Sequence, residues 1–594
     1  MQYSEVEQEY KKLNTEYTTF TRQSNAISKG RLFLFFIFLV FMVIGITDHN
    51  FNFFLFGVTA FLFFCILIVR HAWIEKEIQH KKAGLSVLKK YLDRYLEEWR
   101  DFSDDGTEFL KKNDWVSKDL DILGPYSLYQ FLCVANTYSG RKELAQTLCK
   151  PNKDISILKR NEAIKELLEK QAFSLELETH SQKIGWNRTA EDEKYETFLN
   201  YCENQKTSFP KILMLLCVAF PIVFLGMLLL AWLGKLHVAY LGIYFVIAIA
   251  ISWLLSGMTG KILSGISSFA NSMEIYIDMF HMISEEKFTS SYLIELQEKL
   301  TGANGIHKGL SRLKFIGESY NLRYNLFIYQ GLCGTLLWDL QLAMALEKWK
   351  HIYGMKIKEW FNVIAQMEML LSLAVLGRVR ECSFANITDD DKVHMEAVKM
   401  SHPLIPKDKV VPNSIREKAK TIVITGSNMS GKTTFLRTIG MNLVLAYIGA
   451  PVCAKNLICS KMHIFTSMRV TDDVGGGIST FYAEILRIKS MVEYSANGEA
   501  IVCLIDEIFK GTNSADRIVG AKAVIEKLSR KNTLIYVSTH DFELCEMSEN
   551  NVAKAANYHF EEYYKKNMLE FDYQLRNGRC KTTNALQLMK MAGL

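Results

Sequence analysis

With 594 residues, the chain exceeds what one hydrophobic core supports, so we expect several domains. Hydrophobic residues make up 49% of the sequence, including 36 Phe, which is high for a purely soluble protein, whereas the 23% of charged residues is ordinary. The net charge of +6 does not by itself indicate nucleic-acid binding, because basic flanks beside membrane segments explain it equally well.

The 12 cysteines are scattered and form no C-x-x-C pair, which argues against both a zinc site and a disulfide framework. Several lie inside apolar runs, where buried reduced thiols are the usual state: Cys65, Cys217 and Cys503. The soluble part of the chain therefore fits a reducing, cytoplasmic setting.

Residues 1–31 have a helical pattern, in which apolar side chains recur at spacings of three and four: Tyr3, Val6, Tyr10, Leu13, Tyr17 and Phe20. The run is too short for an independent coiled coil, so we expect it to pack on the next helix of the same chain. Two apolar runs follow, 32–47 and 51–69, with a short polar turn between them. The polar lead and the second apolar run argue against a cleaved signal peptide. We therefore predict a transmembrane hairpin at residues 32–70.

A second transmembrane hairpin is predicted at residues 211–256, where the apolar runs 212–233 and 238–255 flank a short turn. Pro221 would kink a soluble helix but is tolerated in a membrane span. The alternative for all four runs is a set of buried helices in a soluble core. Basic residues lie at the ends away from both turns: Lys29, Arg31, Arg70, Lys76, Lys206, Lys211 and Lys261. This asymmetry predicts a multi-pass protein of the cell membrane with both termini and the soluble parts in the cytoplasm.

Residues 71–210 and 257–400 are predicted to be helical, beginning with an amphipathic helix at 85–99. The stretches 119–132, 136–148 and 155–168 are all expected to be mainly helical. The regularly spaced Trp338, Trp349 and Trp360 are interpreted as core residues of long helices. At His402-Pro403 the pattern changes to alternating strands and helices, which predicts an α/β domain at residues 401–594.

A β-branched run at 421–424 predicts a short buried strand, after which the chain reads Gly426, Ser427, Asn428, Met429, Ser430, Gly431, Lys432, Thr433 and Thr434. This matches G-x-x-x-x-G-K-[ST], the phosphate-cradling loop between a strand and a helix. The glycines let backbone N–H groups turn toward a polyphosphate, and the N-terminal end of the following helix attracts the anion. Lys432 is expected to reach the β- and γ-phosphates, and the Thr433 hydroxyl to hold Mg²⁺.

A second buried strand is predicted at 501–505, and it ends in the acid pair Asp506 and Glu507. At a Mg²⁺-nucleotide site, Asp506 would bind the metal through water or the Thr433 hydroxyl, and Glu507 would polarise the attacking water. A third strand, at 533–538, precedes His540, which could sense a γ-phosphate. A surface or capping role is the alternative for this histidine.

Two further stretches, 472–481 and 510–516, are richer in Gly, Ser and Thr than ordinary connectors. In the first, Ser479 or Thr480 can cap the helix that carries Glu484, and the N-terminal end of that helix could meet a phosphate. The second follows the acid pair and is typical of a rigid loop at a subunit face. For either loop alone, a helix cap and a turn explain the pattern as well as a functional role does.

Together, these motifs resemble the ATPase domain of the MutS family, the ABC-type ATPases of DNA mismatch repair. The resemblance rests on residues 425–440, 446–454, 478–484, 504–517, 538–540 and 571–594. The pair Asn428-Met429 and the signature around Thr480 are specific to this family among ABC-type ATPases. A weaker likeness at 136–168 is to the start of the family's helical core, the lever that joins the ATPase to the DNA clamp.

The resemblance implies an α/β P-loop ATPase domain of the ABC/MutS type, preceded by an all-α lever-like core that here carries four transmembrane helices in two hairpins. It implies ATP and Mg²⁺ as cofactors, and a homodimer with composite sites. The phosphate loop, Asp506, Glu507 and His540 would form one half of each site. The other half would come from Ser479, Thr480 and Phe481 of the partner subunit.

The sequence also departs from the family pattern. Ser430 stands where the family usually has a third glycine and Ser427 where it usually has proline, and neither change blocks phosphate binding. The mismatch-reading and connector domains have no counterpart, the hairpins interrupt the core, and the sequence stops at Leu594 without the family's extra dimerisation segment. The resemblance therefore implies the nucleotide chemistry of the family for this chain more strongly than it implies mismatch recognition.

Three functions remain open at this stage. The first is a membrane-anchored MutS-like ATPase that binds DNA at the inner face of the membrane. The second is an ATP-driven switch or scaffold that binds a protein partner and no DNA. The third is an ABC-like transporter, against which stand the small number of spans and the lack of ionisable residues in their middles.

Overall fold

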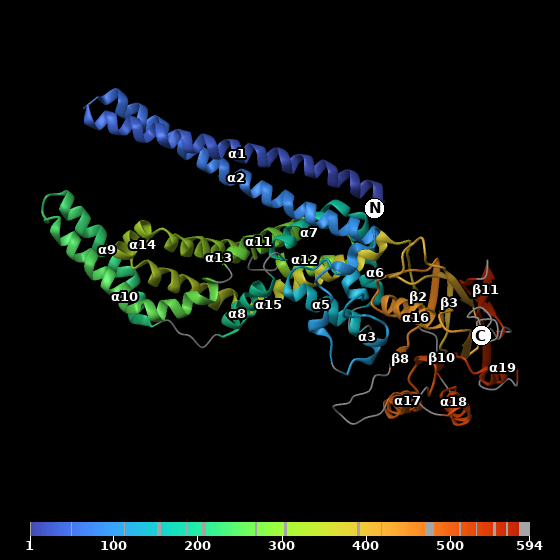
Figure 1. Ribbon diagram of the computed structural model, residues 1–594. Helices are drawn as coiled ribbons and strands as arrows, with labels where there is room; N and C mark the ends of the chain where they lie inside the picture. The colour runs from blue at the N-terminus through green and yellow to red at the C-terminus, as the bar shows by residue number, and fades with distance from the viewer. Residues whose placement is uncertain are drawn as a thin grey trace.

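The computed structural model divides into a mostly helical N-terminal part and a C-terminal α/β part (Figure 1). It describes residues 2–48, 50–111, 113–150, 156–185, 188–204, 210–267, 270–301, 306–388, 392–416, 419–469, 480–509, 513–529, 532–549, 554–565 and 568–580. The side chains of a few residues beside these gaps are outside the description. The last helix of the helical part ends at Val379 and the first strand begins at Ser383, so strands start earlier than the predicted boundary at residue 400.

Two helical hairpins project from the body of the molecule, and their tips lie at the end farthest from the C-terminal sheet (Figure 1). The first pairs α1 (Tyr3–Thr47) with α2 (Phe51–Tyr95), so the polar N-terminal segment does pack on the next helix, as predicted. The second pairs α9 (Lys211–Trp232) with α10 (Ala239–Ser267). Only 6–11% of the most apolar stretch of each of these four helices lies inside the molecule, which contradicts the alternative of four buried core helices.

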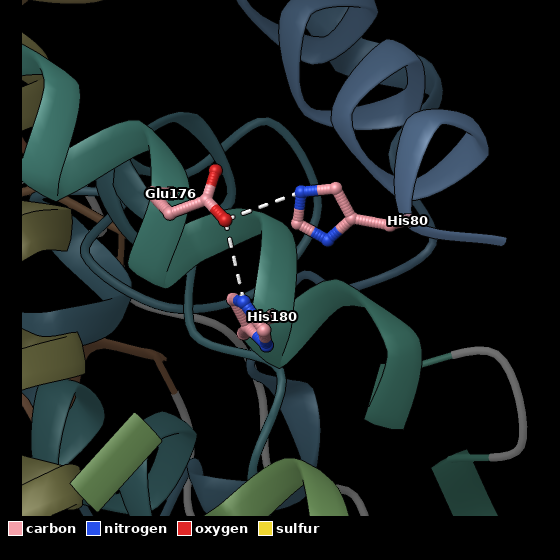
Figure 2. A group of neighbouring side chains, drawn as sticks. All are labelled: His80, Glu176 and His180. Atoms are coloured by element: carbon pink, nitrogen blue, oxygen red, sulfur yellow. Dashed lines mark ion pairs between the residues drawn. The ribbon is translucent and has the colours of Figure 1, made fainter. Parts of the chain in front are cut away.

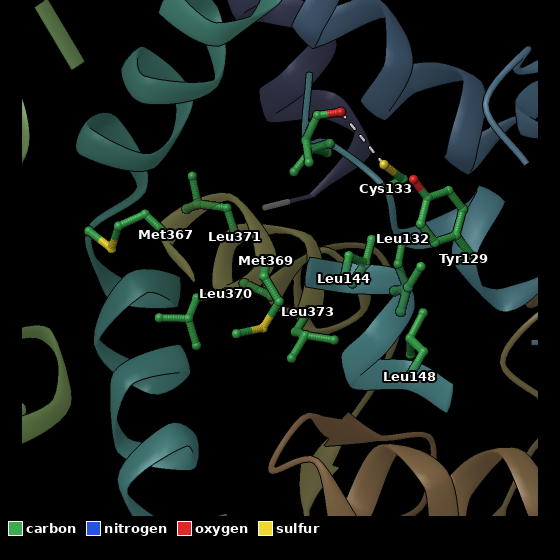
Figure 3. Packing of buried hydrophobic residues seen from close by; sticks show 14 of the residues in the cluster. Tyr129, Leu132, Cys133, Leu144, Leu148, Met367, Met369, Leu370, Leu371 and Leu373 are labelled. Atoms are coloured by element: carbon green, nitrogen blue, oxygen red, sulfur yellow. Dashed lines mark hydrogen bonds between the residues drawn. The ribbon is translucent and has the colours of Figure 1, made fainter. Parts of the chain in front are cut away.

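Five helices in the described part of the chain are long and apolar enough to cross a membrane, and the fifth is α15 (Trp338–Val379). It differs from the others because 89% of its most apolar stretch is buried. It packs against α5 (Tyr138–Cys149), and Figure 3 shows Met369 and Leu373 of α15 in one buried cluster with Leu144 and Leu148 of α5. Trp349 and Trp360 are buried on the same helix, which confirms the core role predicted for these two residues.

The helical part contains nine further described α-helices. They are α3 (Trp115–Asp119), α4 (Leu128–Leu132), α6 (Ile157–Glu169), α7 (Gln171–Gly185), α8 (Arg188–Glu203), α11 (Ala270–Glu285), α12 (Ser291–Thr301), α13 (Ile306–Asn321) and α14 (Leu326–Leu336). The helices predicted at 136–148 and 155–168 correspond to α5 and α6. The prediction for 119–132 was wrong, because only Asp119, at the end of α3, and Leu128–Leu132 are helical, and Gly124 has a φ of +104° beside Pro125, which no helix accommodates.

The α/β part contains two larger sheets. The six-stranded sheet has the order β12-β11-β5-β10-β9-β8, formed by Met568–Asn577, Ala555–Lys565, Thr421–Thr425, Thr533–Thr539, Ile501–Asp506 and His463–Ser467. The four-stranded sheet has the order β2-β7-β3-β4, formed by Asn386–Thr388, Asn456–Ser460, Met395–Met400 and Asn413–Arg416. A short ladder joins β1 (Ser383–Phe384) to β6 (Pro451–Val452). Four helices complete this part: α16 (Lys432–Tyr447), α17 (Thr480–Ala496), α18 (Ser514–Leu528) and α19 (Glu546–Glu549).

Five of the six strands in the larger sheet run parallel, and only β12 is antiparallel to its neighbour. Strands β5, β9 and β10 are buried along their whole length, as their continuous apolar runs predict. Their register places Thr425 beside Thr539, and Asp506 beside Ser538. The three strands predicted from sequence therefore end at one edge of the sheet, where ligands of open parallel sheets bind.

Candidate functional site

The loop between β5 and α16 begins at Gly426 and reaches Gly431, immediately before the helix. Both glycines have positive φ, +148° and +105°, which side-chain-bearing residues rarely adopt. A Cβ on Gly426 would lie 2.7 Å from the Ser430 hydroxyl and 2.9 Å from the Phe560 carbonyl oxygen. The loop therefore requires glycine at this position, and it delivers the chain to the N-terminal end of α16.

Lys432, the first residue of α16, is buried with its ammonium group inside the loop. Its Nζ donates to the carbonyl oxygens of Gly426, at 2.9 Å, and Ser427, at 2.8 Å. His540 Nε2 lies 3.4 Å from the same nitrogen. The positive charge is thus concentrated at the edge of the sheet and beside the helix N-terminus, where an anion is favoured.

Thr433 and Asp506 meet across the edge between α16 and β9. The Thr433 hydroxyl donates to Asp506 Oδ2 at 2.9 Å, and the other carboxylate oxygen accepts a hydrogen bond from Ser538 of β10. A hydroxyl and a carboxylate oxygen at this separation are oxygen ligands of the kind that Mg²⁺ prefers, so the residues fit a magnesium ion.

Glu507 and His540 form the other polar pair of the site. His540 Nε2 lies 2.8 Å from Glu507 Oε1, and the Glu507 backbone N–H donates to the Ser538 carbonyl oxygen at 3.0 Å. Glu507 has a φ of 53°, which turns its side chain out of the strand direction. Non-glycine residues in this region cluster at functional sites.

A cavity of about 410 Å³ opens beside the loop, and its lining includes Asn428, Met429, Gly431, Lys432, Thr433, Thr434 and Glu507. The rest of the lining was not predicted and includes His402, Ile405, Val410, Phe560 and Tyr573. Burial and the nearby Arg437 charge lower the pKa of His402 to about 4, so its imidazole is neutral at pH 7. The prolines after residue 402 indicated a loop here, but no sequence pattern indicated that the loop faces the phosphate-loop segment.

The other loop residues take different positions. Ser427 donates to the Glu562 carboxylate of β11, Met429 is 84% exposed, and Ser430 is buried, with no hydrogen-bond partner for its hydroxyl among the described residues. Ser479 lies outside the described residues, as do 470–478 and 510–512. Thr480 is the first residue of α17, and its side chain is also outside the description. On α17, Glu484 is buried and accepts a hydrogen bond from the Phe509 backbone N–H at 2.6 Å.

A buried carboxylate joins the helical part to this region. Asp119 of α3 accepts hydrogen bonds from the backbone N–H groups of Met468 and Arg469, each at 3.1 Å, and from Arg487 Nη1 at 3.0 Å. The Asp119 carbonyl oxygen also accepts from Arg437 of α16 at 3.0 Å. One turn of the helical part therefore contacts the phosphate-loop helix, the end of β8 and α17.

The fold and the site together define an α/β protein in which a lysine, two carboxylates and a histidine converge beside a glycine-containing loop. Residues 422–594 match the family model described as MutS domain V. Over 245 residues the chain is 29% identical to the DNA mismatch repair protein MutS of Natronomonas pharaonis. That match covers 40% of this chain, and the chain spans only 28% of the relative's length. The C-terminal region of the chain is therefore similar to MutS-family proteins, which confirms the resemblance found in the sequence.

Proposed function

We propose that the chain is a membrane-anchored MutS-type ATPase, which binds and hydrolyses ATP at the carboxyl edge of its six-stranded sheet. The observation that carries the proposal is the convergence of Lys432, the Thr433–Asp506 contact and the Glu507–His540 pair beside one glycine loop. The similarity to a DNA mismatch repair protein MutS supports the same proposal.

Each residue has a separate task in this proposal. Lys432 and the N-terminal end of α16 bind the β- and γ-phosphates, while Thr433 and Asp506 hold Mg²⁺, which when bound neutralises phosphate charge. Glu507 accepts a proton from the attacking water, and His540 orients the Glu507 carboxylate and contacts the γ-phosphate. The apolar and aromatic wall with Phe560 and Tyr573 accommodates the base, because planar rings favour aromatic and apolar surroundings.

Substitution of Glu507 tests the assignment. Glu507→Gln should reduce turnover by roughly 10²–10⁴-fold, the usual contribution of a general base, while ATP still binds. Lys432→Ala should abolish ATP binding itself. Glu543→Gln, which changes an exposed glutamate three positions after His540, is the matched control and should leave both properties unchanged. Full turnover in Glu507→Gln would refute the role given to this residue.

We extend the proposal to a homodimer in which the segment around Ser479 and Thr480 of the partner subunit completes each site, as the family resemblance implies. The exposed apolar hairpins support anchoring in the cell membrane, with the α/β part in the cytoplasm. Sedimentation of the detergent-solubilised chain with and without ATP tests dimer formation. Glu507→Gln should accumulate as dimer in ATP, and a monomer under these conditions would contradict the composite site.

The macromolecular partner in this proposal is DNA, as the similarity to the MutS family suggests. Binding of duplex and branched DNA to the solubilised chain should weaken as salt rises, because phosphate contacts release counterions. The exposed hairpins, attached directly to the helical core, favour a second candidate, an ATP-driven switch that binds a protein partner. Absence of DNA binding at low salt would reject the first candidate and favour the second. Solute flux in liposomes, driven by ATP, would instead favour an ABC-like transporter.

A further inference from the structure

Two histidines and a glutamate meet in the helical part, on helices distinct from those of the nucleotide region. His80 lies on α2, whereas Glu176 and His180 lie one turn apart on α7, so both project from the same face of that helix. Figure 2 shows the Glu176 carboxylate between the two imidazole rings, with an ion pair to each. The ligand atoms of all three residues lie within 4.8 Å of one another.

Two of the three distances between these atoms are close to those around a tetrahedral metal ion, and the third lies within 4.8 Å. Glu176 Oε1 lies 3.1 Å from His80 Nε2 and 3.3 Å from His180 Nε2. A tetrahedral Zn²⁺ with bonds of about 2.0–2.2 Å separates neighbouring ligand atoms by about 3.4 Å. A metal can therefore enter with only small side-chain movements, and a water molecule can take the fourth position.

Asp278 occupies a position like that of the carboxylates that orient histidine ligands in metal sites. Asp278 of α11 places Oδ2 3.8 Å from Nδ1 of His180, the ring nitrogen opposite the proposed ligand atom. That Nδ1 is buried and has no hydrogen-bond partner among the described residues. When a metal binds Nε2 of His180, the proton of the neutral ring is on Nδ1, which can then donate a hydrogen bond. A carboxylate facing Nδ1 fixes this tautomer and makes Nε2 a more basic ligand.

We propose that His80, Glu176 and His180 bind a divalent transition-metal ion, Zn²⁺, with Asp278 as the positioning residue. Two neutral imidazoles and one carboxylate are borderline nitrogen and oxygen donors, which suit Zn²⁺ better than Mg²⁺ or Ca²⁺. The side chains of His80 and His180 are 27% and 15% exposed, and that of Glu176 is 46% exposed, so the ion can enter from solvent. The cysteine pattern argued against a zinc site, but this site uses no cysteine.

The position of the site gives it a structural role. Helix α2 is the second helix of the first hairpin, and α11 directly follows α10, the second helix of the other hairpin. Both α2 and α11 pack on α7. Lys76 of α2 and Glu274 of α11 already form an ion pair at 2.9 Å. A metal bound to α2 and α7, with α11 as its outer support, would fix the two hairpins relative to each other.

Metal binding to the full-length, tag-free chain in detergent tests the proposal. The chain is stripped with EDTA, returned to buffer with excess Mg²⁺, and titrated with Co²⁺, whose visible absorption is intense in tetrahedral sites. We expect one equivalent of Co²⁺ to give this spectrum, and Zn²⁺ to displace it. His180→Ala and Glu176→Gln should lose the spectrum, and Asp278→Asn should weaken binding roughly 10–100-fold.

The matched control is His281→Ala, which removes an exposed histidine paired with Glu285 on α11 and should bind Co²⁺ as the wild type does. Circular dichroism establishes that each variant is folded, and the conservative Glu176→Gln and Asp278→Asn keep the test decisive if His180→Ala unfolds. The wild type should also unfold at a higher temperature with Zn²⁺ than without it. No Co²⁺ spectrum in the wild type, or an unchanged spectrum in Glu176→Gln, would overturn the proposal and leave a hydrogen-bonded cluster.

Discussion

Asp119 should control how firmly the helical part holds the segment that leads from β8 toward residue 470. Its carboxylate is buried and accepts from two backbone N–H groups and from Arg487, which is itself only 8% exposed. In Asp119→Asn, one of the two side-chain oxygens becomes an NH₂ group, which cannot accept. At least one donor therefore loses its partner, and the charge of Arg487 loses its counter-ion.

The expected loss of stability is large for a single polar atom. Removing one partner of a buried ion pair costs about 3–5 kcal/mol, because the other charge is left desolvated and unpaired. Asp121 supplies the comparison, since it lies two positions away and pairs with Arg469, whose side chain is 49% exposed, and at 3.5 Å with Arg437. Asp121→Asn retains a residue that tolerates the positive φ of 49° and should cost at most about 1 kcal/mol.

Hydrogen exchange measures this difference directly. The backbone N–H groups of Met468 and Arg469 donate to Asp119, so a local loss of about 3 kcal/mol should make them exchange roughly 100-fold faster in Asp119→Asn. Urea unfolding of the same samples reports the global change. Equal exchange in Asp119→Asn and Asp121→Asn, together with equal unfolding midpoints, would refute the reasoning that burial makes Asp119 the stronger contact.

Three further outcomes are expected. Gly426→Ala should lower ATP affinity and cost roughly 1–3 kcal/mol, because its φ of +148° is rare for alanine and the new Cβ would meet Phe560 and Ser430; unchanged isothermal titration would contradict this. Arg378→Met should cost about 3–5 kcal/mol in urea unfolding, since it leaves the buried Glu178, 2.8 Å from Arg378, without its charge partner; a loss below 1 kcal/mol would be inconsistent with the pair. The folded-state pKa of His402, about 4, lies below the unfolded value near 6.5, so this residue makes the protein lose stability as pH falls from about 6.5 to about 4. His402→Asn should flatten that slope in unfolding curves at pH 7 and pH 5, and an identical slope in both proteins would rule out the lowered pKa as its cause.

The predicted site elements were those with local signals. The strand Thr421–Thr425, the helix that begins at Lys432 and the strand Ile501–Asp506 were predicted from an apolar run followed by a glycine loop or an acid pair. Because the parallel strands β5 and β9 end at the same edge of the sheet, Thr433, which follows β5, and Asp506, which ends β9, lie in contact. The local sequence pattern was sufficient to predict these elements, because each is short and buried and ends at residues with a strong conformational or chemical preference.

The missed features depend on contacts between distant segments. At 119–132, apolar spacing suggested a helix, but Asp119 and Asp121 bond to residues about 350 positions later in the chain, and Gly124 with Pro125 ends any helix. Two of the residues that line the cavity come from distant segments: His402 lies in the loop after β3, and Tyr573 lies in β12. No sequence motif connects these two segments. The His80 cluster joins two helices, and its residues His80 and Glu176 lie more than 90 positions apart in the sequence.

Helix α15 raises a question about the order of synthesis. By length and composition it qualifies as a membrane span, as the four hairpin helices do, yet most of its apolar stretch belongs inside the protein. Its principal packing partners, α5, α10 and α6, all precede it in the chain. When α15 leaves the ribosome, the helices that cover it have already been made. Because its packing partners are synthesised first, α15 can pack against protein before the C-terminal sheet has been made. This order disfavours both insertion of α15 into lipid and its aggregation during synthesis.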